Sequence, residues 1–124
     1  MKKVFVLGQN PSNNKCIGIA TSNRTHDRLQ VWMTRCGVNN YSFTNCVYKI
    51  GIVKLSDVDW DFMFGLEIDY YDKVLALGNF ASNVLINMCI SHYRLPHPSP
   101  RNRVLNDREY ESSILTECKK YVNE

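Results

Sequence analysis

The sequence predicts an α/β fold: a three-layer α/β/α sandwich with a small, four-stranded, mainly parallel central sheet. Two observations predict this fold. Short apolar runs alternate along the chain with segments in which apolar residues recur at helical spacing. The central runs are apolar throughout, as in parallel strands that are buried on both faces. The chain has 124 residues and no linker-like stretch, so we expect one domain over residues 1–124.

The first half of the chain predicts two strands with a helix between them. Residues 3–7 are apolar and partly β-branched, and they lead through Gly8 into a loop rich in turn-forming residues. A helix is expected after Ser22, and Gly37 is expected to end it. Residues 41–50 predict the second strand. The helix has an apolar face of four residues: Leu29, Trp32, Met33 and Cys36.

The middle of the chain predicts a short helix, a buried strand and a second long helix. Residues 56–59 read as a capping box that starts the short helix with Ser56 as the cap, and Gly65 ends it. Residues 73–77 are apolar between their ends and predict a strand buried on both faces. Gly78 then turns the chain directly into a helix.

The end of the chain predicts a short fourth strand, a proline-rich loop and a last helix. The strand covers residues 92–95, and three prolines stiffen the loop over residues 96–103. Asn106 and Glu109 are expected to cap the last helix. Ligands of parallel sheets bind at the carboxyl ends of the strands. We therefore expect the site in four segments: residues 8–14, the residues from Asn45 onward, residues 78–79 and residues 97–103.

Composition excludes several classes of protein. A net charge of +3 and a pI near 8.6 permit nucleic-acid binding without requiring it. The five cysteines are odd in number and form no CxxC pair, which indicates reduced thiols in a cytoplasmic setting. We expect no metal and no cofactor. The apolar runs are too short for a membrane span, and residues 1–7 reach a loop too early for a signal peptide. A monomer is favoured.

Four segments resemble motifs of the uracil-DNA glycosylase superfamily. Residues 4–12, VFVLGQNPS, resemble its first motif, a strand leading into GQDPYH in one branch and GxNPG in another. Residues 95–100, LPHPSP, are similar to its last motif, HPSP. Residues 43–47, FTNCV, resemble the middle strand whose Asn reads the base, and residues 74–78, VLALG, resemble the junction before the last motif. Order and spacing agree over residues 3–103.

The resemblance implies a DNA glycosylase that hydrolyses the N-glycosidic bond of uracil or a modified pyrimidine by water attack on a flipped nucleotide. Asn10 would position the water, and His97 would donate a hydrogen bond to the base carbonyl as charge develops there. Asn45 offers one donor and one acceptor, which match the O4 and N3–H edge of uracil. The implied base contacts are Gln9, Ser12, Phe43 and Asn45. The implied DNA or phosphate contacts are Lys15, Ser99, Arg101, Asn102 and Arg103.

The chain also departs from the family pattern. Ser12 stands where the GQDPYH branch has the Tyr that excludes the methyl group of thymine. The aromatic residue that stacks on the base has no clear downstream counterpart, which leaves Tyr41 or Phe43 to stack, or Ile17 or Ile19 to cover the base. The chain is short for this superfamily, and such a compact version suggests a viral or mobile-element protein.

Two alternative functions stay open. One is a non-catalytic protein that binds a nucleotide, a nucleobase or modified DNA in the same pocket. The other is hydrolysis of a free nucleotide or a hypermodified thymine. The water site discriminates between catalysis and binding, because only an enzyme needs room for both the sugar and an attacking water near Asn10. The partner is therefore single- or double-stranded DNA, or a nucleotide.

Overall fold

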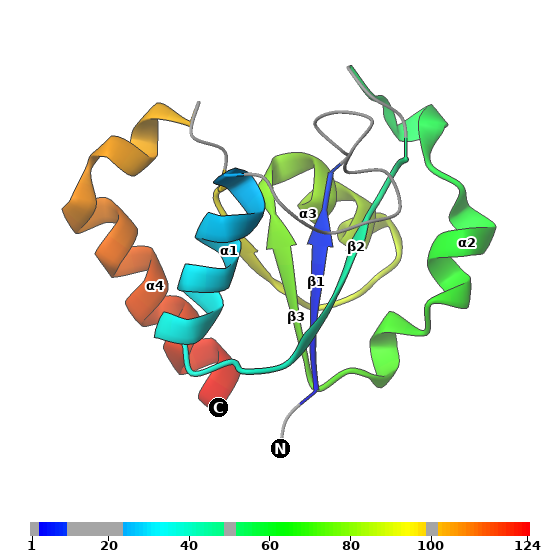
Figure 1. Ribbon diagram of the computed structural model, residues 1–124. Helices are drawn as coiled ribbons and strands as arrows, with labels where there is room; N and C mark the ends of the chain where they lie inside the picture. Colours follow the sequence, from blue (N-terminus) through cyan, green and yellow to red (C-terminus); the bar gives the residue numbers. More distant parts are fainter. Residues whose placement is uncertain (1–2, 10–23, 49–51, 99–101) are drawn as a thin grey trace.

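The computed structural model describes residues 3–9, 24–48, 52–98 and 102–124. These residues form four strands and four α-helices, linked in part by short 3₁₀ turns (Figure 1). The strands are β1 (Val4–Gly8), β2 (Tyr41–Asn45), β3 (Lys73–Leu77) and β4 (Tyr93–Leu95). The α-helices are α1 (Arg24–Arg35), α2 (Trp60–Gly65), α3 (Gly78–Asn87) and α4 (Arg108–Asn123). The 3₁₀ turns cover Leu55–Asp57, Ile68–Tyr70 and Arg103–Asn106.

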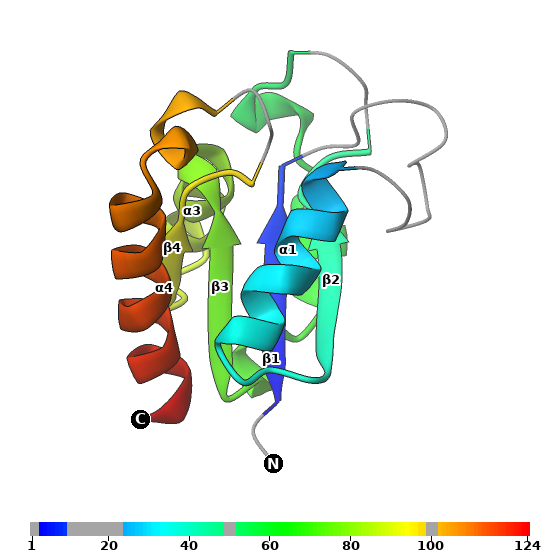
Figure 2. The same ribbon diagram turned by 60° about the vertical axis from the view of Figure 1, so that its left-hand side comes forward.

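The four strands form one sheet in the order β2-β1-β3-β4, and every pair is parallel. Helices α1 and α4 cover one face of this sheet, and α2 and α3 cover the other (Figure 1, Figure 2). The predicted three-layer α/β/α sandwich with a four-stranded parallel sheet is confirmed. The chain leaves β1 toward β2 on one side and returns to β3 on the other, so the strand order switches direction at β1 and β3.

Strand β1 supplies apolar side chains to both layers. Val4 and Val6 belong to the core under α1 and α4, whereas Phe5 and Leu7 belong to the core under α2 and α3. Successive side chains of a strand point to opposite faces, and helices cover both faces of this sheet, so all four side chains are buried. The uninterrupted apolar run is thus explained by burial on both faces.

The predicted apolar face of the first helix is confirmed and joins two helices. Trp32 of α1 is 1% exposed, and its indole Nε1 donates a hydrogen bond to the Glu111 carboxylate of α4 at 3.2 Å. Cys36 and Cys118 are also buried in this core, where the Cys36 thiol donates a hydrogen bond to the Leu115 carbonyl of α4 at 3.7 Å. The core between α1 and α4 therefore combines close apolar packing with hydrogen-bonded polar atoms.

Two predicted helix caps are wrong by a few residues. The residues around Ser56 form a 3₁₀ turn, and α2 starts only at Trp60, where the Asp59 carboxylate accepts from the Phe62 amide at 3.1 Å. Asp107, and not Asn106, caps α4 by accepting from the amides of residues 109 and 110. In both places an aspartate is the cap, because a carboxylate accepts from backbone N–H groups more strongly than a neutral oxygen does.

The second strand is shorter than predicted. It ends at Asn45, and the chain then bends, while residues 49–51 lie outside the described residues. Strand β4 likewise covers only Tyr93–Leu95. No helix among the described residues has the length and apolar character needed to cross a bilayer.

The short β4 leaves part of the β3 edge without a strand partner, and Tyr121 completes that edge. β4 begins opposite Leu75, so Val74 lies beyond its reach. The Tyr121 hydroxyl accepts from the Val74 amide and donates to the Val74 carbonyl, both at 3.2 Å. One phenol of α4 thus satisfies both backbone groups of a buried residue.

We expect Tyr121→Phe to lower the free energy of unfolding by about 1–3 kcal/mol, because it leaves both Val74 backbone groups without this partner. The ring itself remains, so the stacking on Tyr93 with centroids 5.6 Å apart is retained. Urea denaturation followed by circular dichroism measures the change. Tyr70→Phe is the matched control at a residue that is 76% exposed. Equal, small effects of both variants would show that the phenol bridge contributes nothing.

Candidate functional site at the carboxyl edge of the sheet

The carboxyl ends of β1 and β2 are held together beyond the regular strands. Gly8 pairs with Asn45 in the parallel register. Past this pair, the Cys46 amide donates to the Gly8 carbonyl at 2.9 Å, and the Val47 amide donates to the Gln9 carbonyl at 3.1 Å. The first motif and the middle strand of the sequence analysis are therefore neighbours. Gln9 is half-buried, and Asn45 is 8% exposed.

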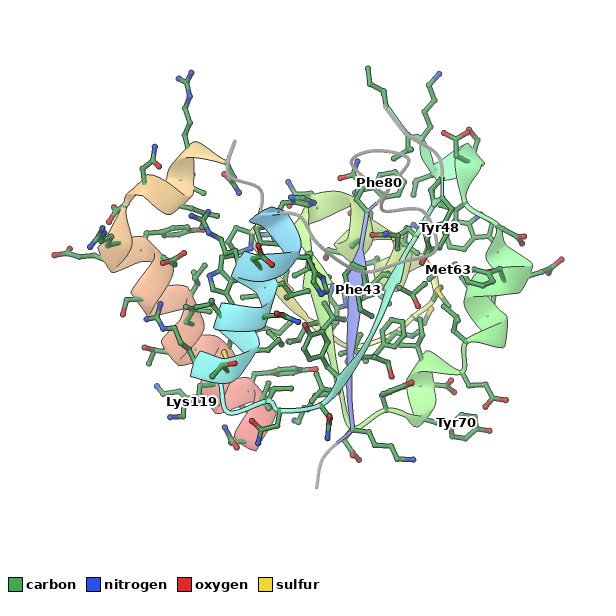
Figure 3. All side chains as sticks on the ribbon, in the orientation of Figure 1. Phe43, Tyr48, Met63, Tyr70, Phe80 and Lys119 are labelled. Atoms are coloured by element: carbon green, nitrogen blue, oxygen red, sulfur yellow. The ribbon has the colours of Figure 1, made fainter. Side chains whose placement is uncertain are left out.

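Gly8 is needed because two side chains lie directly on it. A Cβ atom at this position would stand 2.6 Å from Asn45 Oδ1 and 2.9 Å from Cζ of Phe43. The Phe43 ring lies between β2 and α1 (Figure 3), where its centroid is 6.0 Å from that of His26 in an edge-on arrangement. The structure thus brings Asn45 and Phe43 together at the end of β1. His26 is a neighbour that the sequence motifs did not indicate.

We expect Gly8→Ala to destabilise the fold by about 1–3 kcal/mol, because the new methyl group overlaps two packed side chains. Gly65→Ala is the matched control: its Cβ meets nothing within 4 Å, and an alanine in α2 is neutral or stabilising by up to about 1 kcal/mol. Thermal unfolding of both variants measures the difference. A Gly8→Ala protein as stable as the Gly65→Ala protein would contradict the close approach.

The other predicted aromatic lies elsewhere. Tyr41 pairs with Val4 at the amino end of β1, at the far end of the sheet from Gly8. It therefore does not stack on a base held at the carboxyl edge, and that alternative of the sequence analysis is wrong. The other two alternatives, Ile17 and Ile19, lie outside the described residues.

His97 stands at the carboxyl edge after β4, against the first residue of α3. Gly78 has a φ of 89°, and a Cβ there would lie 3.4 Å from the Cβ of His97. The Asn102 side-chain amide donates to the His97 carbonyl at 3.0 Å and so ties the ends of this loop together. Burial lowers the pKa of His97 from its ordinary value of 6.5. The imidazole is therefore neutral at pH 7, and one ring N–H can donate a hydrogen bond.

The lowered pKa of His97 predicts that the fold loses stability in acid. Below pH 6.5 the unfolded chain binds a proton at this side chain more readily than the folded chain does, so the free energy of unfolding falls as the pH drops through 6.5. Urea denaturation of the wild type and of His97→Gln at pH 7.5, 6.5 and 5.5 isolates the contribution of this residue from that of the other histidines. The stability of the variant should fall less on acidification; an unchanged slope would contradict the prediction.

A cavity of about 310 Å³ opens beside His97, and some of the residues that line it belong to none of the sequence motifs. Its lining comes from the start of α3, from β4 and the loop after it, and from α4. The lining residues are Gly78, Asn79, Arg94, Leu95, Pro96, His97, Asn102, Tyr110 and Ile114. Asn79 was expected at this edge, because it is one of residues 78–79. Arg94 and Tyr110 could not have been found from the sequence, because their approach to the cavity depends on the packing of β4 and α4.

The remaining predicted site residues are placed as follows. Arg103 is exposed at the start of the 3₁₀ turn before α4. The others lie outside the described residues: Asn10, Ser12, Lys15, Ser99 and Arg101. Asn102 lines the cavity, but the structure also uses its amide to hold the His97 carbonyl.

The thiol at this edge is not poised for chemistry. Cys46 follows Asn45 directly and is 2% exposed, and burial raises the pKa of its thiol to about 12. A thiol with this pKa stays protonated at neutral pH and is a poor nucleophile and a poor metal ligand. Within the described parts of the chain, no three His, Cys, Asp or Glu residues gather as a metal site would require.

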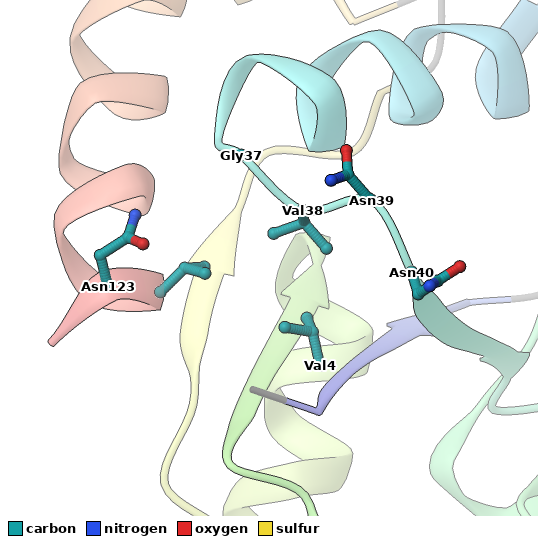
Figure 4. Close-up of a pocket in the computed structure, with 7 residues that line it drawn as sticks. Val4, Gly37, Val38, Asn39, Asn40 and Asn123 are labelled. Atoms are coloured by element: carbon teal, nitrogen blue, oxygen red, sulfur yellow. The ribbon is translucent and has the colours of Figure 1, made fainter. Parts of the chain in front are cut away.

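A second cavity, of about 280 Å³, lies at the opposite end of the sheet (Figure 4). It is formed by Val4 at the start of β1, by the turn between α1 and β2, and by the end of α4. Three asparagines line it: Asn39, Asn40 and Asn123. Because ligands of parallel sheets bind at the carboxyl ends of the strands, this cavity is not part of the candidate site. Its asparagines serve as controls for Asn45.

The comparisons with known proteins add no relative. No protein-family model matches the chain, and no curated protein or solved structure is significantly similar to it. The resemblance to the uracil-DNA glycosylase superfamily therefore stays a prediction from the sequence motifs.

Proposed function

We propose that the chain is a DNA glycosylase that hydrolyses the N-glycosidic bond of uracil or a modified pyrimidine in a flipped nucleotide. One observation carries the proposal. The amide of Asn45 lies on Gly8, while a neutral His97 stands against Gly78 at the same edge of the sheet. Gly8 is the last residue of β1, and Gly78 directly follows β3. These two strands are the neighbours at which the strand order switches, and such a switch point is where parallel sheets bind their ligands.

The residue types suit a leaving group that becomes an anion. As the bond between C1′ and the base nitrogen breaks, its electron pair moves onto the base and negative charge grows on the carbonyl oxygens. The N–H of neutral His97 donates to such an oxygen, and this hydrogen bond strengthens as the charge develops. The side chain of Asn45 offers an acceptor for N3–H and a donor for O4. Phe43 gives an aromatic surface beside that amide.

The remaining step is the attack of water. The water oxygen forms a bond to C1′ as the base departs, the attacking water releases a proton to bulk solvent, and the base anion takes one proton from solvent. The sequence motif assigns the orientation of this water to Asn10. A side-chain amide orients water but does not accept its proton, so we expect slow turnover that depends mainly on stabilising the leaving base.

The lack of carboxylates at the strand ends supports the second candidate, a non-catalytic protein that binds a nucleotide or modified DNA. None of the described residues that directly follow the strands at the carboxyl edge is a carboxylate; they are Gln9, Cys46, Gly78 and Pro96. With no carboxylate at these four positions to act as a general base, the pocket could recognise a base without cleaving its bond.

Base release tests the proposal. Purified protein is incubated with labelled single- and double-stranded oligonucleotides that carry uracil, thymine, 5-hydroxymethyluracil or hypoxanthine, and the abasic product is cleaved and counted. We expect release of uracil or a modified pyrimidine. His97→Ala should slow release by about 10²–10³-fold, as the loss of one donor to a developing anion does. Asn45→Ala should slow it through lost base binding.

Two control variants make the test specific. Asn39→Ala changes an exposed asparagine of the opposite cavity and should leave release unchanged. His97→Gln keeps a donor of different reach and should retain part of the activity. If no substrate loses its base, while binding to a nucleotide or oligonucleotide is intact and depends on Asn45, the chain is the non-catalytic binder.

A further inference from the structure

The cavity beside His97 is lined by a charged side chain, Arg94, which has no role in the proposed base site. It lies at the carboxyl end of β4, between the start of α3 and α4. Among its described lining residues Arg94 is the one with a formal charge at pH 7, because His97 is neutral and no carboxylate takes part. The other polar lining side chains are Asn79, Asn102 and Tyr110. A cavity of this composition favours an anion over a cation or a neutral apolar ligand.

Arg94 is held in place by its strand and by α3. In the parallel register it pairs with Ala76. Its strand neighbours Tyr93 and Leu95 belong to the core under α4, so its own side chain points to the opposite face, toward α3. There its Nη1 donates to Asn79 Oδ1 at 2.8 Å. That bond uses one of the five N–H donors of a guanidinium, and the planar group is then oriented before a ligand arrives.

The size and position of the cavity narrow the choice of anion. A volume of about 310 Å³ is at the small end of ligand pockets, which suits a phosphate with its sugar and excludes a ligand much larger than one nucleotide. Donors come from separate elements, which suits the several acceptor oxygens of a phosphate. His97 is shared by this cavity and the proposed base site. An anion bound here is therefore attached to, or next to, the nucleotide whose base reaches His97.

We propose that the cavity, here called the Arg94 pocket, binds a phosphate group carried by the substrate nucleotide. The inference rests on the proposed function in one respect, the placement of the base at His97. The phosphate is either the monoester of a free nucleotide or a diester of the DNA backbone. Both present the same oxygens to Arg94, and the experiment below separates them.

The test compares a nucleoside without phosphate with two ligands that carry phosphate, one as a monoester and one as backbone diesters. Binding of deoxyuridine, dUMP and a short single-stranded oligonucleotide with one abasic analogue is measured for the wild type, Arg94→Gln and Arg94→Lys. We expect Arg94→Gln to weaken dUMP or oligonucleotide binding about tenfold and to leave deoxyuridine binding unchanged. For the oligonucleotide, the slope of log K against log salt should fall by about one. Arg94→Lys should recover part of the loss, since it restores the charge without the fork.

Lys120→Gln is the matched control for charge. Lys120 is exposed near the end of α4 and pairs on the surface with Glu117, away from the cavity lining. A loss for Lys120→Gln equal to that for Arg94→Gln would overturn the proposal, because the effect would then be one of net charge. The proposal would also be overturned if Arg94→Gln weakened the binding of deoxyuridine and dUMP equally, or if the wild type bound neither dUMP nor the oligonucleotide.

The ligands distinguish a phosphate monoester from a backbone diester, and the variants distinguish a failure of the Arg94 pocket from a failure of the glycosylase proposal. An Arg94 effect on dUMP identifies a monoester, whereas an effect confined to the oligonucleotide identifies a backbone diester. If the wild type releases no base and Arg94→Gln still weakens phosphate binding, the glycosylase proposal fails and the Arg94 pocket stands. If bases are released and Arg94→Gln changes no binding constant, the Arg94 pocket fails and the glycosylase stands.

Discussion

The structure depends on the position of β1, which hydrogen-bonds to β2 on one side and to β3 on the other. Its side chains are buried in both helical layers, so one five-residue strand organises two cores. Because β1 is central and all strands are parallel, the segments after β1, β2 and β3 leave the sheet at the same edge. The candidate site is a direct consequence of that arrangement.

Two glycines shape this edge by the atoms they lack. At Gly8 the missing Cβ leaves room for the Asn45 amide and the Phe43 ring, and at Gly78 it permits a positive φ that brings the chain under His97. Polar side chains from different strands can therefore lie close to the backbone at the strand ends. A bulkier residue at Gly8 would displace Asn45 and Phe43, and one at Gly78 would press on His97.

The charge at the edge is divided between two neighbouring regions. The proposed base site uses neutral groups, Asn45 and an uncharged His97, which would bind a base through directed hydrogen bonds. The cavity beyond His97 is lined by the guanidinium of Arg94, an exposed residue that donates to Asn79. A nucleotide has the same division, with a polar base at one end and an anionic phosphate at the other. Binding energy from the phosphate can then orient the base and sugar, and its loss would affect every base equally.

The sequence by itself determined the strands and the buried helix faces, because the spacing of apolar residues along the chain is a local property. The strand over residues 73–77 is one example. It also placed Asn45 and His97 at the carboxyl edge, although the strand that ends at Asn45 was expected to run to residue 50. The helix caps were missed because neighbouring polar residues compete, and Asp59 accepts where Ser56 was expected. Arg94 was missed because its direction depends on the register of β4 against β3. Only the tertiary structure decided that β1 lies between β2 and β3, since strand order comes from the packing of both layers and not from local periodicity.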